Sequence, residues 1–142
     1  MGKTDIFISY RREGGRDIAR TISLALGKYG YNKVFFDFNS IRDGVFNEQI
    51  IQAINECNDF ILVLSAHAMD RCCNEDDWVA KEISTAILSG CKIIPVVIGD
   101  TFDGWPEEFP RKLSIIKNIQ FSKLLTDEYF DDSIVKMISR LT

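Results

Sequence analysis

Phe60-Ile61-Leu62-Val63-Leu64-Ser65 is a run of large apolar residues that ends in a serine. A strand of a parallel sheet has this composition when helices cover both of its faces, because every side chain is then buried. The run is the clearest strand signal in the chain. We therefore place it at the centre of a parallel sheet.

Strand-like and helix-like segments alternate on both sides of this run. The predicted strands are Asp5–Tyr10, Val34–Asp37, Phe60–Ser65, Lys92–Ile98 and Ile115–Phe121. The predicted helices are Arg16–Tyr29, Phe46–Cys57, Asn74–Ser89 and Glu128–Leu141. Such alternation indicates right-handed βαβ units. We predict an α/β fold, a flavodoxin-like three-layer sandwich in which a five-stranded parallel sheet of order 2-1-3-4-5 has helices on both faces.

Length and charge favour one soluble domain over residues 1–142. The net charge of −4 and the pI near 5.0 argue against a protein that coats nucleic acid or an anionic membrane. The sequence shows neither a signal peptide nor an apolar run long enough to span a membrane. We expect a cytoplasmic protein with no direct nucleic acid binding and no membrane association.

Cysteine and histidine are too few and too poorly spaced to predict a metal site. The four cysteines stand at positions 57, 72, 73 and 91, and His67 is the single histidine. No two cysteines have the Cys-x-x-Cys spacing, and His67 with Cys72 and Cys73 lacks a fourth ligand. We expect reduced thiols and no bound metal.

Trp78 and Glu82 stand near the start of the third predicted helix. Asn74 is the expected N-cap, and the acidic residues 75–77 suit a first turn. Apolar residues then recur at the helical spacing expected of a core-facing side, namely at Val79, Ile83, Ala86 and Ile87. Trp78 and Glu82 are four residues apart and therefore lie one above the other, at the sheet edge where ligands bind. The residues alone leave two interpretations, a sugar-binding ring and acid/base carboxylate or an ordinary helix start.

Several common uses of such a sheet are excluded by missing motifs. No Gly-x-Gly-x-x-Gly follows the first strand, and no Gly-x-x-x-x-Gly-Lys-Ser/Thr loop is present, which disfavours dehydrogenases and P-loop NTPases. A phospho-receiver domain would need an acidic cluster after strand one and an aspartate after strand three, but these strands end in Ser9-Tyr10-Arg11-Arg12 and Ser65. With one histidine, no Ser/His/Asp triad fits either.

The segments together resemble the TIR (Toll/interleukin-1 receptor) domain family in order and spacing. Asp5–Tyr10 resembles the first box of the family, and Phe60–Ser65 resembles its third strand. Phe36-Asp37 with Ile41–Phe46 resembles the second strand and the BB loop, and Trp78-x-x-x-Glu82 resembles the catalytic helix. The resemblance extends from Asp5 to about Leu141.

Within the family, the chain is most similar to NAD-cleaving members known from animal axon degeneration and from prokaryotic defence. The shared features are Ser9-Tyr10-Arg11-Arg12, Gly44-x-Phe46, Asp77-Trp78-Val79-x-Lys81-Glu82-Ile83 and Trp105-Pro106. Asp43 is a departure, since many receptor TIR domains have proline before this glycine. The resemblance implies an NAD+ glycohydrolase that yields nicotinamide and ADP-ribose or a cyclic ADP-ribose. Self-assembly would activate it in immunity, antiviral defence or cell-death signalling, with NAD+ as substrate and no cofactor.

The resemblance also assigns roles to particular residues. Glu82 is the expected catalytic carboxylate; the alternative is a solvated helix glutamate. Trp78 is either part of the site wall or a half-buried cover of the helix start. Trp105 either stacks on nicotinamide or covers the edge of the core. Arg11 and Arg12 either hold the pyrophosphate or ribose, or are solvated loop charges.

The remaining candidates lie on the same rim or on the neighbouring loop. Tyr10, Asp37 and Phe46 are weaker NAD+-binding candidates, and Asp77 with Lys81 is a predicted helix-surface ion pair worth about 0.3 kcal/mol. The predicted assembly loop spans residues 38–46 and includes Ile41, Arg42, Asp43 and Gly44. In NAD-cleaving TIR domains this loop completes the site of the next subunit, so we expect self-association through TIR–TIR contacts. The alternative is a non-enzymatic TIR–TIR signalling scaffold, and in either case a module of a longer protein.

Overall fold

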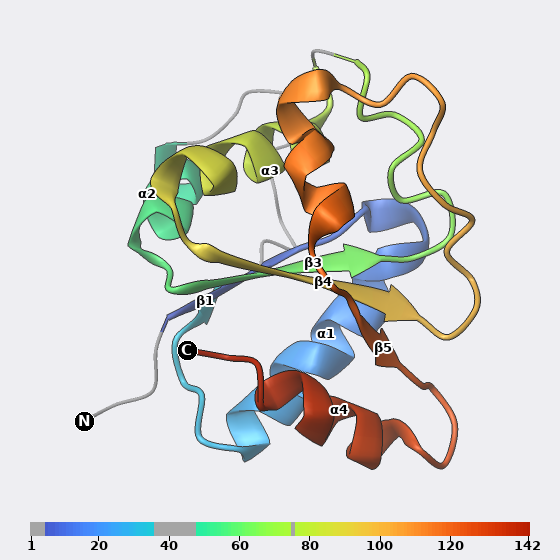
Figure 1. The fold of residues 1–142 in the computed structure, drawn as a ribbon. Coiled ribbons are helices and arrows are strands. Elements are labelled where there is room, and N and C mark those ends of the chain that lie inside the picture. Colours follow the sequence, from blue (N-terminus) through green and yellow to red (C-terminus); the bar gives the residue numbers. More distant parts are fainter. Residues whose placement is uncertain (1–4, 36–47, 75) are drawn as a thin grey trace.

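A five-stranded parallel sheet forms the centre of the structure, a computed structural model that describes residues 5–35, 48–74 and 76–142 (Figure 1). Within these residues the strands have the order β2-β1-β3-β4-β5, which confirms the predicted fold. The strands are β1 (Ile6–Ser9), β2 (Val34–Phe35), β3 (Asp59–Leu64), β4 (Lys92–Ile98) and β5 (Ser122–Leu124). All four pairings between neighbouring strands are parallel.

Helices cover both faces of the sheet and make the molecule a three-layer sandwich (Figure 1). The helices are α1 (Arg12–Lys28), α2 (Glu48–Glu56), α3 (Trp78–Ser89), the 3₁₀ helix η1 (Arg111–Asn118) and α4 (Phe130–Ile138). Figure 1 shows α2, α3 and η1 on one face and α1 with α4 on the other. No helix among the described residues is long and apolar enough to cross a bilayer.

The central strand β3 contributes to a separate apolar core on each face. Phe60, Leu62 and Leu64 pack in the core beneath α2 and α3, whereas Ile61 and Val63 pack toward α1 and α4. This alternation follows from the two-residue repeat of a strand. All six residues of β3 are buried; this was predicted for the apolar residues Phe60–Leu64, whereas the strand also includes Asp59.

Pro95 lies inside β4 at a place where proline is tolerated. Strand β4 pairs with β3 from Lys92 to Val97, and Leu62 is opposite Pro95. Strand β5 pairs only with Val96–Ile98. The side of β4 that faces β5 is therefore not paired at Pro95, and the missing N–H of proline is tolerated there.

The predicted fifth strand at Ile115–Phe121 is wrong. Residues 111–118 form the 3₁₀ helix η1, and the strand that closes the sheet is β5 at Ser122–Leu124. Leu113 and Ile116 are both fully buried in the core beneath α3. Their spacing of three residues matches the repeat of a 3₁₀ helix and not the alternation of a strand.

The predicted start of α3 is also wrong, by four residues. The helix begins at Trp78, and its N-cap is Asp77 and not Asn74. The Asp77 carboxylate accepts a hydrogen bond of 3.1 Å from the backbone N–H of Ala80, which satisfies a donor that the helix start leaves unpaired. At the other end, Gly90 has φ of 79° and closes the helix in the left-handed conformation that favours glycine.

Smaller differences concern the ends of the other elements. Helix α1 contains non-helical backbone at Glu13 and at Gly14, whose φ is 84°, so its regular part starts close to the predicted residue 16. Helix α4 is shorter than the predicted Glu128–Leu141. The predicted second strand and second helix agree with β2 and α2 over the described residues.

Candidate functional site

A cavity of about 390 Å³ opens at the carboxyl ends of the central strands. This is the edge at which open α/β sheets bind ligands. The described residues that line the cavity come from the end of β1, the start of α1, the loop before α3 and α3 itself. They are Ile8, Tyr10, Arg11, Arg12, Glu13, Arg71, Asn74, Asp76, Asp77, Trp78, Val79 and Glu82.

Glu82 places its carboxylate in this cavity and is held there by the end of β1. Ser9 Oγ donates a hydrogen bond of 2.6 Å to Glu82 Oε1. Ser9 is 1% exposed, so its hydroxyl has little freedom to turn away. A hydrogen bond from a buried, rigid donor fixes the orientation of the carboxylate that it contacts.

Ser9 was not among the predicted site residues. Its role depends on a contact between residues 73 positions apart, which no local pattern reveals. The available signal is its place at the carboxyl end of a buried strand, where ligand-binding edges form.

Trp78 lines the cavity beside Glu82 and is half-buried. The Lys81 ammonium lies 5.5 Å from the centre of the Trp78 ring, a cation–π contact. The predicted ion pair between Lys81 and Asp77 is wrong, because Asp77 faces the protein interior and binds a different cation.

That cation is Arg11, which joins the end of β1 to the N-terminus of α3. Arg11 Nη2 donates to Asp77 Oδ2 at 3.0 Å, and Nη1 pairs with Asp77 Oδ1. Nε and Nη2 also donate to the carbonyl oxygen of Ala68 at 2.9 and 2.7 Å. Burial disfavours the charged guanidinium, but the hydrogen bond and charge of Asp77 outweigh it and raise the pKa of Arg11. This geometry favours a structural role for Arg11 over the predicted contact with pyrophosphate or ribose.

Tyr10 and Arg12 line the mouth of the cavity as predicted candidates for ligand contact. Arg12 is exposed and Tyr10 is half-buried. Beside them, the exposed Arg71 forms an ion pair with Glu13. The mouth of the cavity, between the end of β1 and the loop before α3, therefore carries two arginines, Arg12 and Arg71, and the acidic Glu13.

Trp105 is not among the described residues that line the cavity. It packs with Phe102 in an edge-to-face contact of 5.4 Å and with Phe109 at 5.2 Å between ring centres. These three rings pack against the core beneath α3. The observed contacts agree with a cover over the edge of the core, which was the alternative to stacking on nicotinamide.

Six predicted residues lie outside the described part of the chain. They are the rim candidates Asp37 and Phe46 and the assembly-loop residues Ile41, Arg42, Asp43 and Gly44. Their predicted roles stay predictions.

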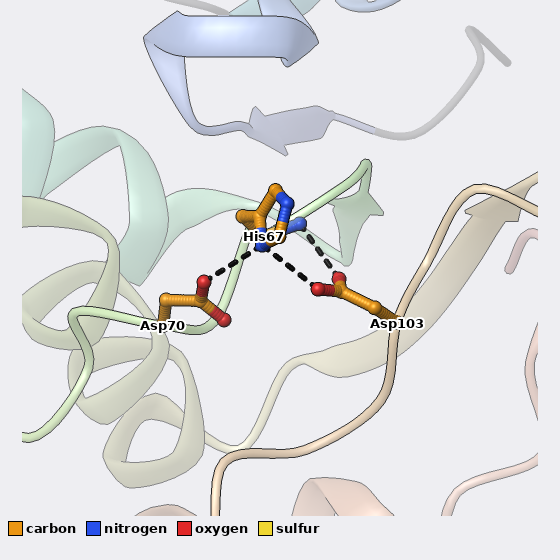
Figure 2. A group of neighbouring side chains, drawn as sticks. All are labelled: His67, Asp70 and Asp103. Atoms are coloured by element: carbon orange, nitrogen blue, oxygen red, sulfur yellow. Dashed lines mark hydrogen bonds and ion pairs between the residues drawn. The ribbon is translucent and has the colours of Figure 1, made fainter.

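His67 joins two loops at the same edge of the sheet (Figure 2). Its Nδ1 lies 2.9 Å from Asp70 Oδ2 and 2.8 Å from Asp103 Oδ2, and its backbone N–H donates to Asp103 Oδ1 at 2.8 Å. The hydrogen bond from this N–H lowers the pKa of Asp103. The ligand atoms of the cluster lie within 4.8 Å of one another. All three side chains are exposed and already paired with one another, and we assign no metal to them.

Residues 6–138 match the family described as "TIR domain". The chain is 40% identical over 111 residues to NAD(+) hydrolase sarm1 of Drosophila melanogaster, an alignment that covers 75% of this chain and 8% of the relative. It is 35% identical over 141 residues to NAD(+) hydrolase SARM1 of Danio rerio, covering 96% of this chain and 19% of the relative. For NAD(+) hydrolase tir-1 of Caenorhabditis elegans the identity is 33% over 144 residues, covering 97% and 14%. The chain therefore spans less than a fifth of the length of these relatives.

Solved structures show the same fold at lower sequence identity. The TIR domains of the activated Roq1 resistosome, which recognises the pathogen effector XopQ, superpose with a TM-score of 0.72 at 16% identity, covering 99% of this chain and 100% of that one. The TIR domain of the Toll-related receptor TRR-2 from Hydra magnipapillata gives 0.58 at 22% identity, covering 97% and 100%. With a match over nearly the whole domain and relatives above 30% identity, this chain belongs to the TIR domain family.

Proposed function

We propose that this TIR domain is an NAD+ glycohydrolase, which cleaves the nicotinamide–ribose bond to nicotinamide and either ADP-ribose or a cyclic ADP-ribose. The observation that carries the proposal is the Glu82 carboxylate, held by Ser9 in the cavity at the carboxyl edge of the sheet. The names of the relatives support it, since proteins 33–40% identical to this chain are NAD(+) hydrolases.

One carboxylate suffices for this reaction. Cleavage of a glycosidic bond passes through a ribose with oxocarbenium-ion character. Nicotinamide leaves NAD+ as a neutral molecule from a cationic ring, so no general acid is needed to protonate it. Glu82 would stabilise the positive charge that develops on the ribose and hydrogen-bond its hydroxyl groups. Attack by water then gives ADP-ribose, and attack by the adenine of the same molecule gives the cyclic product.

Other residues of the cavity would position the dinucleotide. The half-buried ring of Trp78 offers a flat apolar wall next to Glu82. Arg12, exposed at the mouth, would contact the pyrophosphate, with Tyr10 beside it. Trp105 would stack on nicotinamide only if the ring reached beyond the described lining of the cavity.

Replacement of Glu82 tests the proposal directly. Purified wild type at high concentration is incubated with NAD+, and nicotinamide release is followed by chromatography. Glu82→Gln keeps the size of the side chain and removes its charge, and we expect kcat to fall roughly 100-fold or more. Glu128→Gln, an exposed carboxylate before α4, is the matched control and should retain wild-type activity.

Two outcomes would contradict the proposal in different ways. Release that survives Glu82→Gln would refute the assigned carboxylate but leave the activity standing. No release from the wild type, even under crowding, would favour the signalling scaffold, which needs TIR–TIR contacts but not Glu82.

Self-association is part of the proposal. The loop from residue 38 to 46 of one molecule would complete the cavity of the next, as a head-to-tail contact that can repeat along an assembly. The Roq1 TIR domains belong to a resistosome, a multi-subunit assembly, which is consistent with this proposal.

A further inference from the structure

Two cysteines that are far apart in sequence meet at the edge of the sheet opposite the cavity. Cys57 lies between α2 and β3, and Cys91 lies between α3 and β4. Figure 1 shows both connections at the ends of β3 and β4 away from the arrowheads. In the sheet Asp59 pairs with Lys92, and the backbone N–H of Lys92 donates to the carbonyl of Asn58 at 3.0 Å. The residues next to both cysteines are therefore hydrogen-bonded to each other.

The two thiols interact directly. Cys91 packs against the apolar core that includes Cys57, and the two thiols are close enough to shift the pKa of each other. Their exposure differs, because Cys57 is 8% exposed whereas Cys91 is only half-buried. Cys91 Sγ also contacts the carbonyl oxygen of Ala86 at 3.6 Å, which places it beside the last turn of α3.

This asymmetry gives the thiols different reactivity. The Cys57 thiol beside it stabilises the Cys91 thiolate and lowers the pKa of Cys91 to about 7. The interaction with Cys91, together with burial, raises the pKa of Cys57, which therefore stays protonated. Cys91 is thus the accessible nucleophile and Cys57 the protonated partner beside it.

We propose that Cys57 and Cys91 are a redox-modification site, at which hydrogen peroxide or a related hydroperoxide forms a reversible intramolecular disulfide. The proposal is independent of the NAD+ glycohydrolase activity, because it rests on the opposite edge of the sheet.

The oxidation proceeds in two steps, formation of a sulfenic acid on Cys91 and then formation of the disulfide. The Cys91 thiolate attacks a peroxide oxygen, an S–O bond forms, the O–O bond breaks, and the leaving hydroxide takes up a proton to become water. The Cys57 sulfur then attacks the Cys91 sulfenic acid, so that the S–S bond forms and the S–O bond breaks. The departing hydroxide takes the proton of Cys57 and leaves as a second water. Sulfur loses two electrons in total, and the peroxide gains them.

The disulfide would connect the end of α2 to the start of β4 without touching the described lining of the cavity. A cross-link between residues distant in sequence restricts the unfolded chain. The oxidised domain should therefore unfold at a higher temperature than the reduced domain, and a dithiol should reverse the change.

The experiment titrates the domain with hydrogen peroxide and maps disulfides by mass spectrometry of non-reduced peptides. We expect a cross-linked peptide containing Cys57 and Cys91, an intact mass lower by two hydrogens, and a raised melting temperature that dithiothreitol reverses. In the reduced protein, alkylation of Cys91 by iodoacetamide should reach its half-maximal rate near pH 7, whereas Cys72, whose pKa burial raises to about 12, should react slowly.

Cys57→Ser and Cys73→Ser are matched variants. Cys57→Ser should leave Cys91 as a sulfenic acid that dimedone traps, and Cys73→Ser, a change at the exposed cysteine, should still form the cross-link. The proposal is overturned if the wild type gives only disulfides through Cys73, or if Cys91 is oxidised without linking to Cys57. The wild-type mapping requires no variant to fold.

Discussion

At the scale of single residues, the carboxylate of Glu82 depends on its neighbour. A group that stabilises a developing ribosyl cation must keep its orientation while the charge forms. The Ser9 hydroxyl holds Glu82 Oε1 at 2.6 Å, and Ser9 is itself locked at the buried end of β1. The chemistry assigned to Glu82 therefore rests partly on a residue that need not touch NAD+.

Ser9→Ala tests this dependence. Loss of a hydrogen bond to a charged group costs about 1.5 kcal/mol or more, which corresponds to a kcat lower by roughly 10-fold. The KM for NAD+ should change little, because Ser9 is not among the described residues that line the cavity. Ser84→Ala, a serine on α3, is the control, and steady-state nicotinamide release is the measurement. A Ser9→Ala enzyme with wild-type kcat would show that the hydrogen bond is dispensable.

Arg11 and Arg12 are adjacent, but Arg11 is buried and Arg12 is exposed. Their replacement should therefore affect different properties, namely stability for Arg11 and NAD+ binding for Arg12. Arg11→Ala would leave the Asp77 carboxylate buried without its cation, which costs about 3–5 kcal/mol of unfolding free energy. Arg12 is exposed, so Arg12→Ala should change that free energy by no more than roughly 0.5 kcal/mol but raise the KM for NAD+.

Urea unfolding and steady-state kinetics on the same two variants distinguish these outcomes. Arg11→Lys keeps the charge but not the two-pronged contact, and its stability should lie between those of Arg11→Ala and the wild type. If Arg11→Ala were as stable as the wild type and only raised KM, Arg11 would be a substrate contact, as the sequence predicted.

At the scale of elements, α3 is fixed at both ends by different means. Its N-terminus is capped by Asp77, which Arg11 ties to β1, so the helix that carries Trp78 and Glu82 is anchored next to the cavity. Its C-terminus ends at Gly90 with φ of 79°. The first anchor sets the position of the site, and the second stops the helix before β4.

Two glycine substitutions should change stability in opposite directions. Apart from adjacent residues and the backbone of the same helix, an added methyl group meets no atom of the described residues within 4 Å at either Gly90 or Gly27. Gly90→Ala places alanine in the left-handed region and should cost about 1 kcal/mol. Gly27→Ala lies within α1 and should stabilise the domain by about 0.5 kcal/mol, since alanine favours helices. Thermal or urea unfolding measures both, and equal effects of one sign would contradict the conformational explanation.

Element types were predictable from the sequence where hydrophobic repeats were long and unambiguous. The apolar run of β3 and the alternation of strands and helices were enough for the sheet order. The prediction of a strand at residues 115–121 failed because the apolar residues there fit either a strand or a short helix. Only the packing of Ile116 in the core distinguishes the two. The predicted N-cap of α3 was wrong because several neighbouring acidic or amide residues are suitable caps. The hydrogen bond from Arg11 to Asp77, which joins residues far apart in sequence, holds Asp77 in that position.

The candidate site was predictable only in part. Trp78, Glu82, Tyr10 and Arg12 were identified through the family resemblance and do line one cavity. Ser9 was missed because its partner is 73 residues away. Arg11 was assigned to the ligand because a sequence does not show that its donors are directed at Asp77 and Ala68.

At the scale of the whole molecule, the parallel sheet separates two kinds of chemistry. All strands point the same way, so their carboxyl ends gather around the cavity and their amino ends gather around Cys57 and Cys91. Oxidation of the thiols should therefore leave nicotinamide release by the assembled domain unchanged, while changes at the cavity should leave the thiols unchanged.

The proposed assembly makes activity a property of several molecules and not of one. If residues 38–46 of one molecule complete the cavity of the next, nicotinamide release per molecule should rise steeply with protein concentration. Release measured over a wide dilution series checks this dependence. Release per molecule that stays constant across the series would contradict it, because a self-sufficient monomer needs no neighbour.

A mixing experiment separates a shared site from simple crowding. Glu82→Gln has an intact loop but no carboxylate, and Arg42→Glu has the carboxylate but an altered loop. Each should be inactive alone. In a head-to-tail assembly the loop of Glu82→Gln completes the cavity of Arg42→Glu, so the mixture should recover nicotinamide release. A third protein that carries both substitutions supplies neither the carboxylate nor the intact loop, so it should not restore nicotinamide release when it is mixed with either single variant. Recovery only in the first mixture assigns the catalytic carboxylate and the loop to different molecules, whereas no recovery, with both variants folded, places them in the same one.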